Sequence, residues 1–229
     1  MFFIDRYYIL LVVPALLLAS FAQLKVSSAF NTYNRVKTLN GMTGETAARR
    51  ILNSYGIYNV NVVPIPGKLT DHFDPRTNTV SLSQDVFYGS TVAAVGVAAH
   101  EIGHVIQHRV NYAPLKLREV MIPVTNFGSA VSMPMILLGI IFGWGPIVDL
   151  GIICFSLMAI FQLVTLPVEF NASARALKIL KSEGILETRE ENKGAKKVLS
   201  AAALTYVAAL LVSAMQVLRL VFLYHRDDD

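Results

Sequence analysis

Two histidines and a glutamate stand close together in the first half of the chain, within the stretch HEIGH at residues 100–104. In a helix, residues four apart share one face, so the imidazoles of His100 and His104 would lie one turn, about 6 Å, apart along the axis. Both nitrogens could then reach one zinc ion at about 2.0–2.1 Å. Glu101 would point to the flank of that face, where its carboxylate can take a proton from a water on the metal. The spacing predicts a zinc site that activates water.

This arrangement suits the hydrolysis of an amide bond. Zinc lowers the pKa of a bound water toward neutrality, and a nearby carboxylate accepts the proton as the water attacks the carbonyl carbon. The small apolar residues Val95–Ala99 lead into the motif and favour a helix over residues 90–110. His108 continues the four-residue rhythm but lies about another 6 Å along that helix, so we expect it to be a bystander. A longer motif with a third histidine is excluded, because the position that it requires holds Val110.

A third ligand must come from elsewhere, because a catalytic zinc normally has three protein ligands and one water. The candidates are His72, Asp74 and Glu169. Glu169 stands out because it follows a long apolar segment, and alanines and leucines at helical spacing continue after it. A structural zinc would instead be closed by four protein ligands, with His72 or His108 as the fourth.

The composition of the whole chain points to a lipid environment. Hydrophobic residues make up 54% of the 229 residues and charged residues 16%, against roughly 25% charged in an average soluble domain. A helix that spans a bilayer needs roughly 20 apolar residues. The segments that meet this requirement are 7–24, 120–142, 147–168 and 199–224. We predict a mainly α-helical, polytopic membrane protein with about four transmembrane helices.

Two polar regions separate these segments, residues 25–119 and residues 169–198. The first has a helical pattern at 44–55 and alternating, strand-like patterns at 59–64 and 79–83. We therefore expect it to form a small α+β, zincin-like catalytic region that includes the HEIGH helix. The strand at 79–83 could offer its edge to an extended substrate. We expect the second region to be a loop and helix that carry the candidate ligand Glu169.

The distribution of charge predicts the sidedness. Four spans put both polar regions on one side, and these regions hold 10 and 7 basic residues, whereas Arg6 and Arg226 flank the other side. The positive-inside rule predicts a cytoplasmic site with both termini outside. Cleavage of the first span as a signal peptide after Ser20–Ala22 would overturn this topology. Arg219, inside the last span, is expected to extend to the interface as an anchor.

Several of these segments resemble those of a known family. HEIGH followed by PVEFNAS at residues 167–173 is similar to the YugP family of membrane zinc metallopeptidases, and so is LTDHFDPRTNTVSLS at residues 69–83. The resemblance covers nearly the whole chain and implies a Zn²⁺ cofactor. A weaker resemblance reaches the HtpX-type gluzincin membrane proteases, in which the glutamate of an E-x-x-x-D pattern completes the zinc site. It implies that Glu169 is the third metal ligand.

The same comparison leaves two roles open. The pattern ends here on Ser173 instead of aspartate, so Asn171 and Ser173 are both candidates for the residue that orients a zinc-bound histidine. The donor that would stabilise the oxyanion is undecided among His72, Tyr112 and Arg175.

Two functional hypotheses follow. The first is a membrane zinc endopeptidase that cleaves peptide bonds near the bilayer surface, with Glu101 as general base and His100, His104 and Glu169 as ligands. The alternative is a non-proteolytic membrane scaffold or assembly factor that contains zinc. The expected partners are the lipid bilayer and a membrane-associated protein or peptide substrate, with no nucleic acid. The sequence leaves the oligomeric state open.

Overall fold

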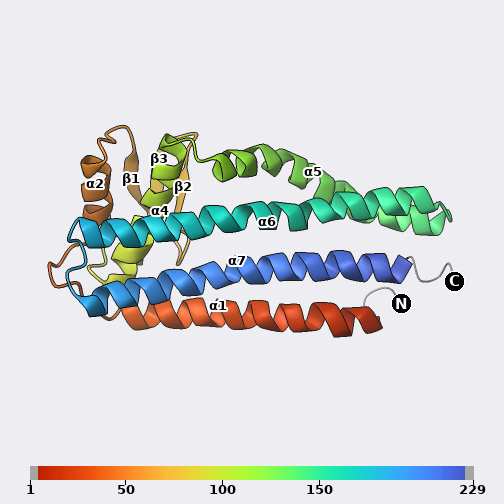
Figure 1. Ribbon diagram of the computed structural model, residues 1–229, viewed down its shortest axis with the longest axis horizontal. Helices are drawn as coiled ribbons and strands as arrows, with labels where there is room; N and C mark the ends of the chain where they lie inside the picture. Colours follow the sequence, from red (N-terminus) through yellow and green to blue (C-terminus); the bar gives the residue numbers. More distant parts are fainter. Residues whose placement is uncertain (1–4, 225–229) are drawn as a thin grey trace. The chain divides into compact units, whose positions relative to one another are not determined.

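The fold is dominated by long helices. The computed structural model describes residues 5–224, and four of its helical segments are long and apolar enough to cross a membrane. These segments are η1 (Tyr8–Val12) with α1 (Val13–Tyr33), α5 (Ala113–Ile141), α6 (Gly145–Ser182) and α7 (Arg189–Tyr224) (Figure 1). The predicted class, a mainly α polytopic protein with a small α+β region, is confirmed.

The described residues divide into two compact units. One, which we call the span unit, holds residues 5–22, 113–167 and 204–224. The other, the site unit, holds Gln23–Tyr112 and Val168–Ala203. The third apolar segment and the helix predicted after it are one continuous helix, α6, with Pro167 in its interior.

A tight hairpin joins α5 and α6 within the span unit. Gly143 adopts a left-handed conformation with φ of 64°, which glycine reaches without steric cost. The amide of Trp144 then donates to the carbonyl of Gly139 at 2.8 Å. A side chain at Gly139 would lie 2.5 Å from Val148 Cγ2, so the hairpin depends on small residues where the two helices begin to separate.

Arg219 has partners that the sequence did not reveal. Its Nη2 lies 2.6 Å from Asp5 Oδ2 and its Nε donates to the same oxygen at 2.8 Å. Its guanidinium also lies 5.2 Å from the centre of the Tyr8 ring. An ion pair offsets part of the cost of holding a charge in an apolar helix, and the role of Arg219 as an anchor at the interface stays a prediction. Arg226, used above for sidedness, lies outside the described residues.

The site unit contains a small mixed sheet. Its strands are β1 (Asn61–Ile65), β2 (His72–Asp74) and β3 (Thr79–Ser83), in the order β1-β3-β2. β3 pairs in parallel with β1 and antiparallel with β2. The prediction that the strand at 79–83 offers a free edge was therefore wrong, because both of its edges are paired. The short strand β2, which the alternation pattern did not reveal, lies at the edge instead.

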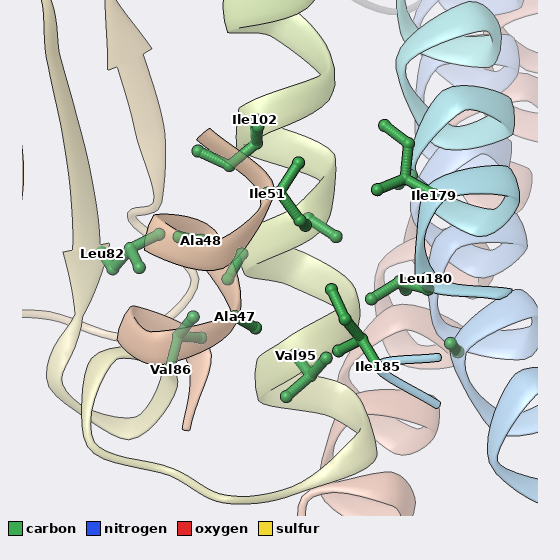
Figure 2. Close-up of a cluster of buried hydrophobic side chains, with 14 of the residues drawn as sticks. Ala47, Ala48, Ile51, Leu82, Val86, Val95, Ile102, Ile179, Leu180 and Ile185 are labelled. Carbon is green, nitrogen blue, oxygen red and sulfur yellow. The ribbon is translucent and has the colours of Figure 1, made fainter. Parts of the chain in front are cut away.

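Three helices lie entirely within this unit, α2 (Gly44–Ser54), α3 (Gln84–Phe87) and α4 (Val92–Arg109), and parts of α1, α6 and α7 also belong to it. Alanines on α2 bring it close to α4, and Figure 2 shows Ala47, Ala48 and Ile51 among apolar side chains of the sheet and α4. Ile179 and Leu180 of α6 belong to the same buried cluster. Helix α4 is buried along most of its length, so its few polar residues need partners inside the protein.

Candidate metal centre

The start of α4 is fixed by capping. The hydroxyl of Thr91 accepts a hydrogen bond from the amide of Ala94 at 3.2 Å, as side-chain oxygens at N-caps do. The same hydroxyl donates to Asn34 Oδ1 at 2.9 Å. The amide of Val92 donates to the carbonyl of Val36 at 2.9 Å. These contacts set the rotation of α4 and hence the face that carries its histidines.

Gly103 allows α6 to approach this face. A Cβ at Gly103 would lie 2.7 Å from the carbonyl oxygen of Ala172 and 3.2 Å from its Cα. The two backbones are therefore closer here than any other residue would permit. The glycine of HEIGH is therefore a requirement of helix packing.

Two imidazoles and one carboxylate converge between α4 and α6. Nε2 of His100 lies 3.2 Å from Nε2 of His104. Glu169 Oε2 lies 3.3 Å from the first nitrogen and 3.5 Å from the second. Glu169 is only 3% exposed. Among the described residues, these three form a group of side chains that could hold a metal ion.

The separations fit zinc. Ligand atoms about 2.0–2.1 Å from a tetrahedral zinc are about 3.3–3.4 Å from one another, and the three separations here are 3.2, 3.3 and 3.5 Å. Imidazole and carboxylate are also ligands that zinc accepts. The donor set and its spacing therefore match a zinc ion held by three protein ligands.

Glu101 is a second buried carboxylate beside this group, with 7% of its surface exposed. Burial raises the pKa of Glu101 above its usual value, against the opposing effect of the imidazoles of His100 and His104. The negative charges of Asp71 and Glu169 act in the same direction as burial. Glu101 is thus a carboxylate that holds a proton more readily than one in water, which is the property needed by a residue that accepts and returns a proton.

The pKa of His104 is raised in spite of its burial. Burial alone would lower this pKa, but the hydrogen bond to the Glu169 carboxylate and the negative charges of Glu101 and Glu169 raise it overall. The surrounding carboxylates therefore favour the protonated form of this imidazole.

Each histidine has a polar neighbour at its other ring nitrogen. Nδ1 of His100 lies 3.1 Å from the hydroxyl of Ser173. Nδ1 of His104 lies 3.0 Å from Oε1 of Gln107, a residue that the sequence reasoning missed. Asn171, the other candidate for orienting a histidine, instead accepts a hydrogen bond from Gln107. Polar partners of this kind are usual for metal-bound histidines.

The remaining candidate ligands lie apart from this group. Asp74 Oδ1 accepts from the amide of Arg76 at 2.9 Å and closes a local turn. Nδ1 of His72 lies 2.9 Å from the carbonyl oxygen of Thr70. His108 is exposed and its ring centre lies 6.0 Å from that of Phe73.

Two of the candidate oxyanion donors contact each other. The guanidinium of Arg175 lies 6.0 Å from the centre of the Tyr112 ring. Nε of Arg175 also donates to Asn171 Oδ1 at 2.7 Å. Arg175 is therefore linked through Asn171 to Gln107, and the choice of an oxyanion donor stays open.

Four helices able to cross a membrane, together with a group of two histidines and a glutamate, fit a membrane-bound zinc protein. The chain belongs to the family described as "Putative neutral zinc metallopeptidase", whose model matches residues 8–225. It is 50% identical over 224 residues to "Putative membrane protease YugP" of Bacillus subtilis (strain 168), an alignment that covers 97% of this chain and 99% of that protein. No solved structure matches. The family confirms the resemblance seen in the sequence and zinc as the cofactor.

Proposed function

We propose that this chain is a membrane zinc endopeptidase of the gluzincin type, which hydrolyses peptide bonds close to the bilayer surface. His100, His104 and Glu169 would hold the zinc ion, and Glu101 would act as the general base. The observation that supports this most strongly is the convergence of two imidazoles and a carboxylate at 3.2–3.5 Å from one another.

The residues divide the chemistry between them. When bound, zinc supplies a Lewis acid that lowers the pKa of water and polarises a carbonyl group. The Glu101 carboxylate takes a proton from the attacking water while the carbon–oxygen bond forms. It then returns that proton to the amide nitrogen as the carbon–nitrogen bond breaks. Burial of Glu101 strengthens its electrostatic interactions during both transfers.

The size of the group favours catalysis over a structural role. Structural zinc sites are usually closed by four protein ligands, whereas the group found among the described residues has three members. The fourth position would remain for water and substrate. A scaffold protein that contains zinc is therefore the less supported function.

The decisive experiment compares the wild-type protein with Glu101→Gln in lipid nanodiscs. We expect the variant to keep the zinc content of the wild type, because Glu101 is not a ligand. We expect its hydrolysis of casein or a fluorogenic peptide to fall by about 10²–10⁴-fold, the usual contribution of a general base. Glu190→Gln, at an exposed position on α7, is the matched control and should behave as wild type. Undiminished hydrolysis by Glu101→Gln would exclude this mechanism.

We further propose that the site faces the cytoplasm, with both termini outside. The support is the 10 basic residues of region 25–119 and the 7 of region 169–198, because basic loops stay on the cytoplasmic side. A single engineered cysteine, Ser182→Cys, in a Cys154→Ala background tests this in intact cells. We expect a membrane-impermeant maleimide to label it only after permeabilisation. Labelling of intact cells would reverse the orientation.

The substrates are expected to be proteins or peptides associated with the membrane. This expectation rests on the chain itself, because Glu169 lies on α6, a helix long and apolar enough to cross a bilayer. A ligand on such a helix keeps the site near lipid. Cleavage of a membrane-inserted model peptide should therefore be faster than cleavage of the same peptide in solution.

A further inference from the structure

Gln107 is fully buried, with 0% of its surface exposed, and its side-chain amide makes three polar contacts. Its Oε1 lies 3.0 Å from Nδ1 of His104. Its Nε2 donates to the carbonyl oxygen of Val168 at 2.8 Å and to Asn171 Oδ1 at 3.0 Å. We propose that Gln107 is a positioning residue that fixes the tautomer of His104 and joins this ligand to the helix segment carrying Glu169. The inference rests on the proposed zinc site.

The orientation of the Gln107 amide follows from its partners. A backbone carbonyl can only accept a hydrogen bond, so the atom of Gln107 that faces Val168 must be the NH₂ group. The atom that faces His104 is then the amide oxygen, which can only accept. Nδ1 of His104 must therefore carry a hydrogen. In the neutral imidazole, this leaves the lone pair on Nε2, the atom that faces His100 and Glu169.

His100 is held in a different way. Its Nδ1 lies beside the Ser173 hydroxyl at 3.1 Å, and a hydroxyl can both donate and accept. Ser173 is therefore compatible with either tautomer of His100. Within this pair of ligands, only the partner of His104 determines where the hydrogen lies. The two histidines of the motif therefore differ: the partner of His104 fixes its tautomer, and the partner of His100 does not.

Gln107 also connects α4 to α6 at the third ligand. Val168 immediately precedes Glu169, and Asn171 follows it by two residues. Asn171 Oδ1 in turn accepts from Nε of Arg175 at 2.7 Å. A buried amide leaves few alternatives, because a lost partner would strand a polar group away from water. The rotation of the α6 segment that carries Glu169 is thus tied to the side chain that orients His104.

Two substitutions test the amide oxygen of Gln107, which accepts from His104, separately from its NH₂ group, which donates to Val168 and Asn171. Gln107→Met has a similar volume and loses both functions, whereas Gln107→Glu keeps an oxygen that can accept from His104. The measurement is zinc affinity in the full-length protein by competition with a chromogenic chelator. We expect Gln107→Met to bind zinc about 10–100-fold more weakly, the usual effect of removing the partner of a metal-bound histidine. We expect Gln107→Glu to lose less affinity than Gln107→Met, because it keeps the acceptor for His104 although it loses the donor to Val168.

A matched control separates positioning from general stability. Val80→Ala removes buried volume from β3 in the same unit, where Val80 is 0% exposed, and Val80 is not in the metal group. We expect it to lower the melting temperature without changing zinc affinity. Wild-type affinity in Gln107→Met would overturn the inference. An equal loss in Gln107→Met and Gln107→Glu would also overturn it, since the acceptor would then not matter.

A second measurement does not depend on zinc or on the variants folding. Nitrogen NMR of ¹⁵N-histidine-labelled, zinc-free wild-type protein reports which ring nitrogen of His104 carries the hydrogen. We expect the hydrogen on Nδ1 for neutral His104, and finding it on Nε2 would overturn the inference. If the wild-type protein bound no zinc, the proposed function would fail, while this spectrum would still decide the tautomer.

Discussion

The two units each contain a partly buried cluster of charged or ionisable side chains, and the clusters are built differently. In the span unit, the carboxylate of Asp5 pairs with the guanidinium of Arg219 at 2.6 Å. In the site unit, the carboxylate of Glu169 faces His100 and His104, whose nitrogens are themselves 3.2 Å apart. The first cluster contains its own permanent cation. The second brings together three groups that can each donate a lone pair, so a metal cation completes its charge balance.

Their surroundings differ in the same way. Arg219 lies over the ring of Tyr8 and beside the amide oxygen of Gln216, at 3.4 Å. These contacts surround a charge pair that is already neutral. The histidines instead have polar partners at the ring nitrogens that face away from the cluster, Ser173 and Gln107. Such partners orient histidines that bind a metal ion. Their presence distinguishes a metal-binding group from a structural ion pair.

The largest expected effect separates the two carboxylates. Glu169→Gln should weaken zinc binding by about 100-fold or more, because it removes an anionic ligand and not only the partner of one. Asp5→Asn should leave zinc binding unchanged, because the charge of Asp5 is already balanced by Arg219. Chelator competition measures both. Similar zinc affinities for the two variants would contradict the proposal that Glu169 is a zinc ligand and that Asp5 is not.

A smaller effect is expected where the partner of His100 changes. Ser173→Asp replaces a hydroxyl by a carboxylate that can only accept from Nδ1 of His100. This would favour the tautomer with its lone pair on Nε2 and make the imidazole a more basic ligand, so zinc affinity should rise by up to about 10-fold. The control is Ser182→Asp, at an exposed position on the same helix. Weaker zinc binding by Ser173→Asp would contradict the expectation.

The smallest effect concerns stability alone. Arg219→Met leaves the Asp5 carboxylate without its cation, and we expect the melting temperature to fall by about 2–4 °C, as for a loss of about 1 kcal/mol in a protein of this size. Adding Asp5→Asn should recover part of the loss, because the unpaired charge is removed. Thermal unfolding in detergent measures these changes. Reduced zinc affinity in Arg219→Met would show that this pair is not only structural.

Much of the fold could be predicted because its signals are local. Long apolar segments identify helices able to cross a membrane without any knowledge of their neighbours. Spacing within HEIGH similarly implies two histidines on one helical face, and the structure places both on α4 beside Glu169. The assignment of these residues as ligands stays a prediction.

What escaped the sequence depends on contacts between distant segments. The short strand β2 exists because it pairs with β3, and three residues carry too little alternation to be recognised. Asp5 and Arg219 are separated by almost the whole chain. Gln107 left only a weak signal, since it lies three residues after His104 on α4 but is followed directly by the polar residues His108 and Arg109. A buried polar residue at that spacing is a reason to look for a partner.

The distribution of the three proposed ligands along the chain bears on how the protein is made. His100 and His104 are synthesised well before Glu169, and the whole of α5 and more than half of α6 lie between them. A nascent chain that has not yet delivered α6 to the translocation machinery therefore carries two of the three ligands and no adjoining helix against Gly103. Under the proposed function, the site would be completed only after most of α6 has been synthesised, and the chain would be inactive until then.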